Sequence, residues 1–151
     1  MQILMKRNIL KITTKKPNLD FKKIVVLLAC LILTTYSYSQ TAQQHLESGQ
    51  SKMKLKDVSG ALNDFNKAIS INPKFEQAIM NRALCQMALG NWSLAIPDCD
   101  RAIKLNPNQA VAYFVRGCAK SNTGKQGCED LNKALELGYT KASLAINQYC
   151  K

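Results

Sequence analysis

The sequence predicts an all-α fold of stacked helix-turn-helix repeats, and three observations support that prediction. Two Asn-Pro pairs, Asn72-Pro73 and Asn106-Pro107, are separated by about 34 residues, a period that is typical of repeat architectures. The residues upstream of each pair repeat at the same spacing: Ala61, Ala68 and Ile69 before the first, and Ala95, Ala102 and Ile103 before the second. Within each copy, apolar residues recur at steps of three and four, which is typical of an amphipathic helix. A fixed period of this kind indicates one unit copied along the chain, with each copy burying its neighbour's apolar face.

The N-terminal segment, residues 1–39, differs in composition from the rest of the chain. Met1 to Lys23 is polar and basic, Ile24 to Leu33 is apolar, and Thr34 to Ser39 is small or aromatic. That layout is typical of a secretory signal peptide. The apolar run is about half of the roughly 20 residues that a helix needs to cross a bilayer, so we expect cleavage rather than a permanent span.

The expected cleavage point follows Ser39, because the small residues Ser37 and Ser39 flank Tyr38 there. The alternative is a tether, either an uncleaved anchor or a lipid on Cys30, since Leu27-Leu28-Ala29-Cys30 resembles a lipoprotein box. We favour cleavage because a chain starting at Cys30 would continue with Leu31-Ile32-Leu33, an unusual start for a tether that lies in water. The sequence thus predicts a signal peptide over residues 1–39 and one mature domain over residues 40–151.

Most of the excess positive charge belongs to the predicted signal peptide. The whole chain has a formal net charge of +11, and residues 1–39 hold seven basic residues and one acidic one, which leaves 14 minus 9, or +5, for residues 40–151. The remaining lysines and arginines are scattered and do not alternate with aromatic residues. This distribution argues against a nucleic-acid partner.

The first copy is predicted to form helices over Thr41–Leu55 and Ser59–Ile71, and the second over Glu76–Leu89 and Ser93–Leu105. We expect close helix contacts at small residues, with Phe65 filling the space beside Gly49. Pro97 lies about one turn into its helix and is tolerated there if Ser93 is the N-cap.

The third copy opens at Ala110, breaks at Gly124 and is two residues shorter than the others. A last amphipathic helix is predicted over Lys141–Cys150, where it would cap the array.

These residues resemble the tetratricopeptide repeat (TPR) family, whose 34-residue unit has a small residue in its first helix, two alanines seven apart in its second and a closing proline. The resemblance covers residues 42–137, or to 150 with the cap helix. It implies a right-handed α-solenoid of three repeats, about 42–75, 76–109 and 110–139, with a cap helix at 140–150. His45 departs from the family pattern, which usually has an aromatic or large apolar residue there.

The C-terminal stretch GCEDLNKALELGYTKA resembles the ends of small exported TPR proteins of Gram-negative bacteria. This likeness implies the periplasm or cell envelope as the location, or secretion.

The sequence argues against an enzyme. His45 is the only histidine, no glycine-rich loop that would cradle a phosphate is present, and the cysteines include no Cys-x-x-Cys pair. We therefore predict no catalytic residues, no cofactor, no metal site and no small-molecule substrate.

Five cysteines remain after the predicted cleavage: Cys85, Cys99, Cys118, Cys128 and Cys150. Cys128 and Cys150 lie at similar distances on either side of the Gly138-Tyr139 turn, so an antiparallel helix hairpin would bring them together. We predict a disulfide between them that stabilises the fold by roughly 3 kcal/mol. Cys99 is expected to be buried. The sequence does not decide whether Cys85 and Cys118 form a second disulfide. A thiol redox function that uses Cys85 or Cys118 is the least favoured hypothesis.

The resemblance also implies a binding surface. In this family the first helix of each repeat lines a concave groove that takes an extended peptide or a helix. The residues implied here are Leu46, Gln50, Met53, Gln77, Met80, Asn81, Leu84, Met87, Val111, Phe114, Cys118, Ser121 and Asn122. Flexible methionines suit varied apolar ligands, although Met80, Leu84 and Phe114 are equally suited to packing between helices.

Family members that hold a carboxylate at a chaperone's C-terminus use Lys, Asn and Arg, and of that set only Asn81 is present. Leu46, Val111 and Val115 stand where the basic residues would be needed, which argues against such a clamp. Arg82 and Arg116 are instead expected to pair with Asp64 and Asp98 across adjoining helices. The leading hypothesis is an exported scaffold that binds a protein or peptide in its groove, and the alternative is a membrane-tethered structural adaptor.

Overall fold

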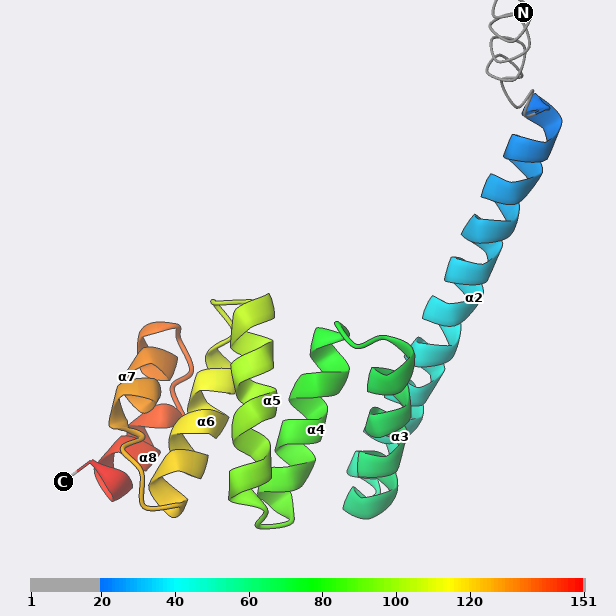
Figure 1. Cartoon of the computed structure of the whole chain (residues 1–151). Coiled ribbons are helices and arrows are strands. Elements are labelled where there is room, and N and C mark those ends of the chain that lie inside the picture. Colours follow the sequence, from blue (N-terminus) through cyan, green and yellow to red (C-terminus); the bar gives the residue numbers. More distant parts are fainter. Residues whose placement is uncertain (1–19, 151) are drawn as a thin grey trace, which may run out of the picture. The chain divides into compact units, whose positions relative to one another are not determined.

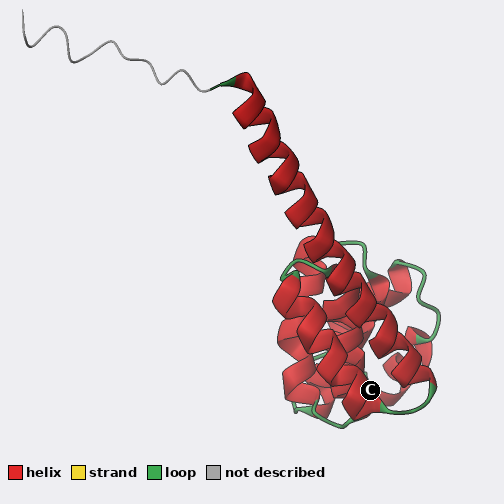
Figure 2. Ribbon diagram, turned by 90° about the vertical axis from the view of Figure 1, so that its right-hand side faces the viewer, coloured by secondary structure: helices red, strands yellow, loops and turns green. Residues whose placement is uncertain are grey.

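The computed structural model describes residues 20–150, so the basic start of the predicted signal peptide, residues 1–19, lies outside the described residues. Figure 1 shows the helices and Figure 2 shows only helices and loops in this part of the chain. The helices are α2 (Phe21–Lys54), α3 (Val58–Ile71), α4 (Glu76–Ala88), α5 (Trp92–Leu105), α6 (Ala110–Asn122), α7 (Cys128–Glu136) and α8 (Ala142–Tyr149).

The chain divides into two compact units, residues 1–36 and residues 37–151. α2 begins in the first unit and ends in the second. The helix predicted from Thr41 therefore starts earlier, at Phe21, because no glycine or proline interrupts the residues between them. In the first unit most apolar side chains of α2 are exposed, from 47% at Val25 to 78% at Phe21. Among the described residues, none of the helices combines the length and apolarity that crossing a membrane requires.

The second unit is a solenoid in which helices pack in chain order. From α3 to α8 each helix contacts the next, and α6 also contacts α4 and α8 (Figure 1). The pairs α4/α5 and α6/α7 are therefore helix hairpins stacked side by side, and α3 pairs with α2 from Thr41 onward. α8 occupies the place that the first helix of a further repeat would take.

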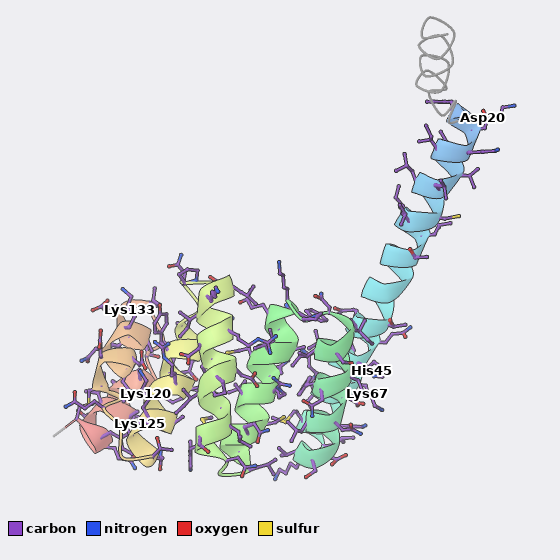
Figure 3. The ribbon with its side chains drawn as sticks, in the orientation of Figure 1. Asp20, His45, Lys67, Lys120, Lys125 and Lys133 are labelled. Atoms are coloured by element: carbon purple, nitrogen blue, oxygen red, sulfur yellow. A yellow bond between two sulfur atoms is a disulfide. The ribbon has the colours of Figure 1, made fainter. Side chains whose placement is uncertain are left out.

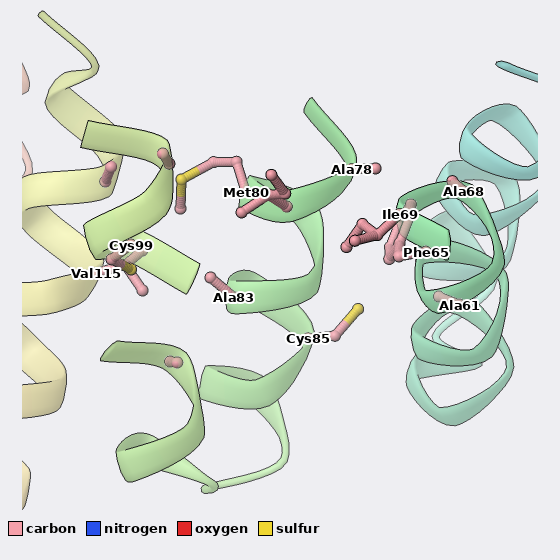
Figure 4. Packing of buried hydrophobic residues seen from close by; sticks show 14 of the residues in the cluster. Ala61, Phe65, Ala68, Ile69, Ala78, Met80, Ala83, Cys85, Cys99 and Val115 are labelled. Atoms are coloured by element: carbon pink, nitrogen blue, oxygen red, sulfur yellow. The ribbon is translucent and has the colours of Figure 1, made fainter. Parts of the chain in front are cut away.

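One continuous core runs through the first two repeats into α6 (Figure 4). Phe65 is its largest fully buried side chain. A Cβ atom at Gly49 would come within 2.5 Å of the Phe65 ring, so the predicted close contact between α2 and α3 depends on this glycine. A smaller cluster of Cys118, Leu131 and Ala145 lies under α8.

The helix boundaries follow local backbone chemistry that the repeat period does not specify. α3 begins at Val58 because the Asp57 carboxylate accepts a hydrogen bond from the Gly60 amide, 2.9 Å away. α5 begins at Trp92, since the amides of Leu94 and Ala95 both donate to the Asn91 carbonyl. The prediction that Ser93 is the N-cap is therefore wrong.

Two turns between paired helices use glycine in the left-handed region. Gly90 has φ +75° and Gly124 has φ +73°, a conformation that side chains with a Cβ rarely adopt. The two glycines occupy the same position in successive repeats, so the turn is repeated together with the helices it joins.

Candidate functional site

The residues predicted to line a groove differ widely in exposure. Leu46, Met80 and Cys118 are buried, with 1%, 5% and 7% of their surface exposed. Gln50, Gln77 and Asn122 are exposed, and Asn81 and Ser121 are half-buried. The half-buried apolar residues of the predicted groove lie on α2, α4 and α6 and pack against the core. We name these five the apolar strip: Met53, Leu84, Met87, Val111 and Phe114.

The buried members of the predicted groove pack between helices. For Met80, this role is the alternative to ligand binding that the sequence predicts. Leu46 and Met80 both belong to the central core cluster. Cys85, also in this cluster, lies with its Sγ 3.3 Å from the Met53 Sδ, which joins α2 to α4. The apolar strip is thus the part of the predicted groove that a ligand could contact.

The positions where a carboxylate clamp would need basic residues are apolar and mostly inaccessible. Leu46 is 1% exposed and Val115 is 0% exposed, and Val111 is half-buried in the apolar strip. A lysine or arginine at either buried position would have to leave the core to reach a ligand. Only Asn81 of the clamp residues is present.

The ion pairs of Arg82 and Arg116 differ from the predicted ones. Arg82 does pair with Asp98, at 2.6 Å, but Arg116 pairs with Asp130, also at 2.6 Å, rather than with Asp98. Asp64 is bonded by the Lys52 ammonium at 2.8 Å and the Ser48 hydroxyl at 2.6 Å. Each pair therefore lies within one repeat, and the predicted pairing of an arginine with the aspartate of the repeat before it was wrong.

Each arginine also reaches back to the second helix of the preceding repeat. Arg82 Nη1 donates to Asn66 Oδ1 at 2.9 Å, and Arg116 Nη1 donates to Asp100 Oδ1 at 2.6 Å. Sequence reasoning missed Asn66 and Asp100, although they occupy matching positions in successive repeats, as the two arginines do. These contacts hold successive repeats together.

His45 is partly packed. Its side chain is 35% exposed and its Nδ1 lies 3.9 Å from Asp64 Oδ1 (Figure 3). In the part of the chain that the structure describes, no group of three His, Cys, Asp or Glu side chains is placed to hold a metal ion.

The free cysteines of the solenoid are poorly suited to redox chemistry. Cys85, Cys99 and Cys118 are buried and form no disulfide, so the possible bridge between Cys85 and Cys118 is not formed. Burial raises the pKa of the Cys85 and Cys118 thiols to about 11 and that of Cys99 to about 12. Since the thiolate is the nucleophile, these groups react slowly in the folded chain.

Cys128 and Cys150 are joined by a disulfide with an S–S distance of 2.11 Å and a Cα–Cα distance of 5.7 Å. The bond connects the first residue of α7 to the residue that follows α8. It closes a shallow pocket of about 530 Å³, formed by residues 124–128, Ser121, Tyr149 and Cys150.

The comparisons with known proteins agree with this architecture. Two tetratricopeptide repeat models match the chain, over residues 45–75 and 76–109. The chain therefore carries tetratricopeptide repeats. The shortened third hairpin, α6/α7, lies beyond the matched residues.

Among curated relatives, the E3 ubiquitin-protein ligase CHIP of Arabidopsis thaliana is 30% identical over 102 residues, which are 66% of this chain and 37% of that protein. The DnaJ homolog subfamily C member 7 homolog of Dictyostelium discoideum is 34% identical over 125 residues, 74% of this chain and 23% of that protein. The chain thus spans less than two fifths of either relative.

Among solved structures, the first TPR of Spaghetti (RPAP3), bound to the HSP90 peptide SRMEEVD, matches with a TM-score of 0.70 and 26% identity. The match covers 74% of this chain and 92% of that one. The Arabidopsis OM64 TPR domain matches with a TM-score of 0.70 and 25% identity, covering 74% of this chain and 96% of that one.

Proposed function

We propose that this chain is a non-catalytic interaction module that binds a protein or peptide segment through the apolar strip on its first helices. The main support for this proposal is the apolar strip. Its five side chains on α2, α4 and α6 pack against the core but are only half-buried, so a ligand can reach them. The structural relative with the HSP90 peptide supports a peptide ligand, because its fold matches 74% of this chain.

The strip fits a neutral amphipathic helix or an extended apolar segment rather than an acidic C-terminus. A carboxylate needs basic side chains or amides to replace its hydration, and the clamp positions carry Leu46, Val111 and Val115. Flexible methionines such as Met53 and Met87 can adapt to a ligand's apolar side chains. In this respect the proposed ligand differs from the peptide SRMEEVD of the relative.

Charge placed on the strip is expected to weaken ligand binding strongly. A panel of fluorescein-labelled 15-residue peptides, with leucines spaced i, i+3, i+4 and i+7 and no net charge, is titrated with the full chain by fluorescence anisotropy, beside SRMEEVD. We expect dissociation constants on the order of micromolar for the best amphipathic peptides and no saturation with SRMEEVD. The double substitution Leu84→Glu/Met87→Glu should weaken binding at least tenfold.

The matched control for that experiment is Leu94→Glu, because Leu94 is an apolar residue of α5 with 55% of its surface exposed. This variant should bind like the unsubstituted chain. Equal losses at Leu94 and at the strip, or tighter binding of SRMEEVD than of every neutral peptide, would contradict the proposed ligand class.

We also propose that the module is exported and that residues 1–39 are a signal peptide removed after Ser39. The exposed apolar residues from Val25 to Leu33 support a segment that enters an apolar environment before the solenoid folds. The alternative is a tethered adaptor, which the exposed side chain of Cys30 supports. The final compartment would be the periplasm or envelope of a Gram-negative bacterium, or the medium.

Intact mass of the chain expressed in a Gram-negative host distinguishes these cases. We expect the protein in the periplasmic fraction, with a mass that begins at Gln40 and rises by about two units on reduction of one disulfide. A mass that includes residues 1–39, or lipid on Cys30, would replace the soluble module by the tethered adaptor.

A further inference from the structure

The C-terminal segment of the chain contacts one face of α6 from Phe114 to Asn122. Phe114, Cys118 and Asn122 stand four residues apart, so they form one stripe on that helix. The Phe114 ring lies 4.8 Å from the Tyr139 ring, centroid to centroid. Cys118 packs in the cluster with Ala145, and Asn122 Nδ2 donates to the Tyr149 hydroxyl oxygen at 3.0 Å. All three are residues that the resemblance placed in the groove.

α8 is held on this stripe by modest contacts. It has eight residues, and its buried side chains are Ala142 and Ala145. Such a short helix does not persist alone in water, so its order depends on packing and on its covalent link. That link is the disulfide of Cys150 to Cys128, which lies at the end of α8 nearest Asn122.

The disulfide is accessible to a thiol in solution. Both cysteines are half-buried and line the shallow pocket of about 530 Å³ together with Tyr149 and the loop 124–127. Lys125 lines the same pocket. The three free cysteines of the solenoid are buried, so this bond is its accessible sulfur site.

We propose that the Cys128–Cys150 disulfide is a redox gate for the C-terminal end of the ligand-binding face. In the oxidised chain α8 covers the middle of the α6 stripe, at Cys118. Reduction by a dithiol protein or a small dithiol releases α8, and Cys118 then extends the apolar strip from Phe114 toward the C-terminus. This regulation rests on the proposed function, because it controls access to the same face.

Reduction of the Cys128–Cys150 bond is a thiol–disulfide exchange that needs no reactant besides the dithiol. A thiolate of the dithiol attacks one sulfur, the bond between Cys128 and Cys150 breaks, and the departing thiolate takes up a proton while a mixed disulfide forms. The second thiol of the reductant then displaces the remaining cysteine. Two electrons and two protons have passed to the chain, and the reductant leaves as its own disulfide.

The rate of Cys118 alkylation tests the gate directly. The full chain, oxidised or treated with dithiothreitol, is exposed to short pulses of N-ethylmaleimide, and peptide mass spectrometry follows each cysteine. We expect the Cys118 rate to rise at least tenfold on reduction. Cys85 and Cys99, each 0% exposed in the other core cluster, are internal controls whose rates should stay unchanged. The variant Cys128→Ser/Cys150→Ser should give the fast Cys118 rate without any reductant.

An unchanged Cys118 rate would overturn the gate, as would a parallel rise at Cys85 and Cys99, which would mean that the whole domain had opened. The best neutral peptide of the panel is then titrated into both states. We expect at least fivefold tighter binding to the reduced chain, and equal binding to both states would overturn the control of ligand access. Absence of binding to either state would instead contradict the proposed function, while the alkylation rates would still decide whether α8 is released.

Discussion

Replacing Gly127 by alanine is expected to destabilise the solenoid by about 3 kcal/mol, near the upper end of the usual cost of overpacking. The added Cβ would overlap the carbonyl oxygen of Gly117 and lie 2.5 Å from the Ser121 hydroxyl oxygen. Because one of these neighbours is backbone, α6 and α7 would have to separate. Urea unfolding followed by circular dichroism measures the loss as a lower midpoint at an unchanged slope.

Gly124→Ala is the matched control in the same loop. Gly124 has φ +73°, but a Cβ there would meet no atom within 4 Å. Its cost is limited to backbone strain of about 1 kcal/mol. Gly127 has φ −106°, so its own cost is steric. Equal effects of the two substitutions would show that α6 and α7 adjust freely and that their close approach has no structural role.

Replacing Arg116 by methionine is expected to cost about 3 kcal/mol, because it leaves a buried carboxylate without its main partner. The Asp130 side chain is 7% exposed and accepts two hydrogen bonds from Arg116, at 2.9 and 2.6 Å. Lys120 remains 2.7 Å from Asp130 and keeps the cost below that of a fully unpaired charge. Lys133→Met is the control, since its pair with Glu136 lies at the surface and should contribute no more than about 0.5 kcal/mol.

The pH dependence of unfolding distinguishes the electrostatic contribution of the Arg116–Asp130 pair from the packing of the Arg116 side chain. Burial raises the pKa of Asp130, but the hydrogen bonds from Arg116 and Lys120 lower it further, so the net pKa lies below the usual value. A carboxyl group with a depressed pKa in the folded state stabilises the fold above its unfolded pKa of about 3.9, and the contribution is lost as the pH falls below that value. Arg116→Met should flatten this acid-side loss. An unchanged acid-side slope would show that Arg116 acts through its aliphatic part alone.

The repeat period was sufficient to predict the order of helices and the contact of Gly49 with Phe65. It could not predict where the first helix starts, because residues 21–40 contain nothing that stops a helix and belong to a segment with a different predicted role. It also gave the wrong start for α5, where the backbone carbonyl of Asn91 rather than the Ser93 side chain satisfies the first amides.

For the predicted binding face, the sequence did not predict how deeply each side chain is buried. Helical spacing identifies the side of a helix on which a residue lies, but the depth depends on the neighbour that packs there. Leu46, Met80 and Cys118 share the predicted face with Leu84 and Phe114, yet they are covered by adjacent helices. Matching positions likewise identified the arginines and aspartates, but the stacking of the helices decided which of them meet.

The bonds that Arg82 and Arg116 make to the preceding repeat also limit how this array can be lengthened. The second repeat carries both halves of the junction, an arginine at position 82 and an acceptor at Asp100, so a duplicate inserted after it would bond correctly on both sides. The first repeat has Ser48 in place of the arginine, too short to reach back to an earlier repeat. Growth by duplication is therefore favoured in the middle of this chain, and the first repeat is chemically suited to remain the first.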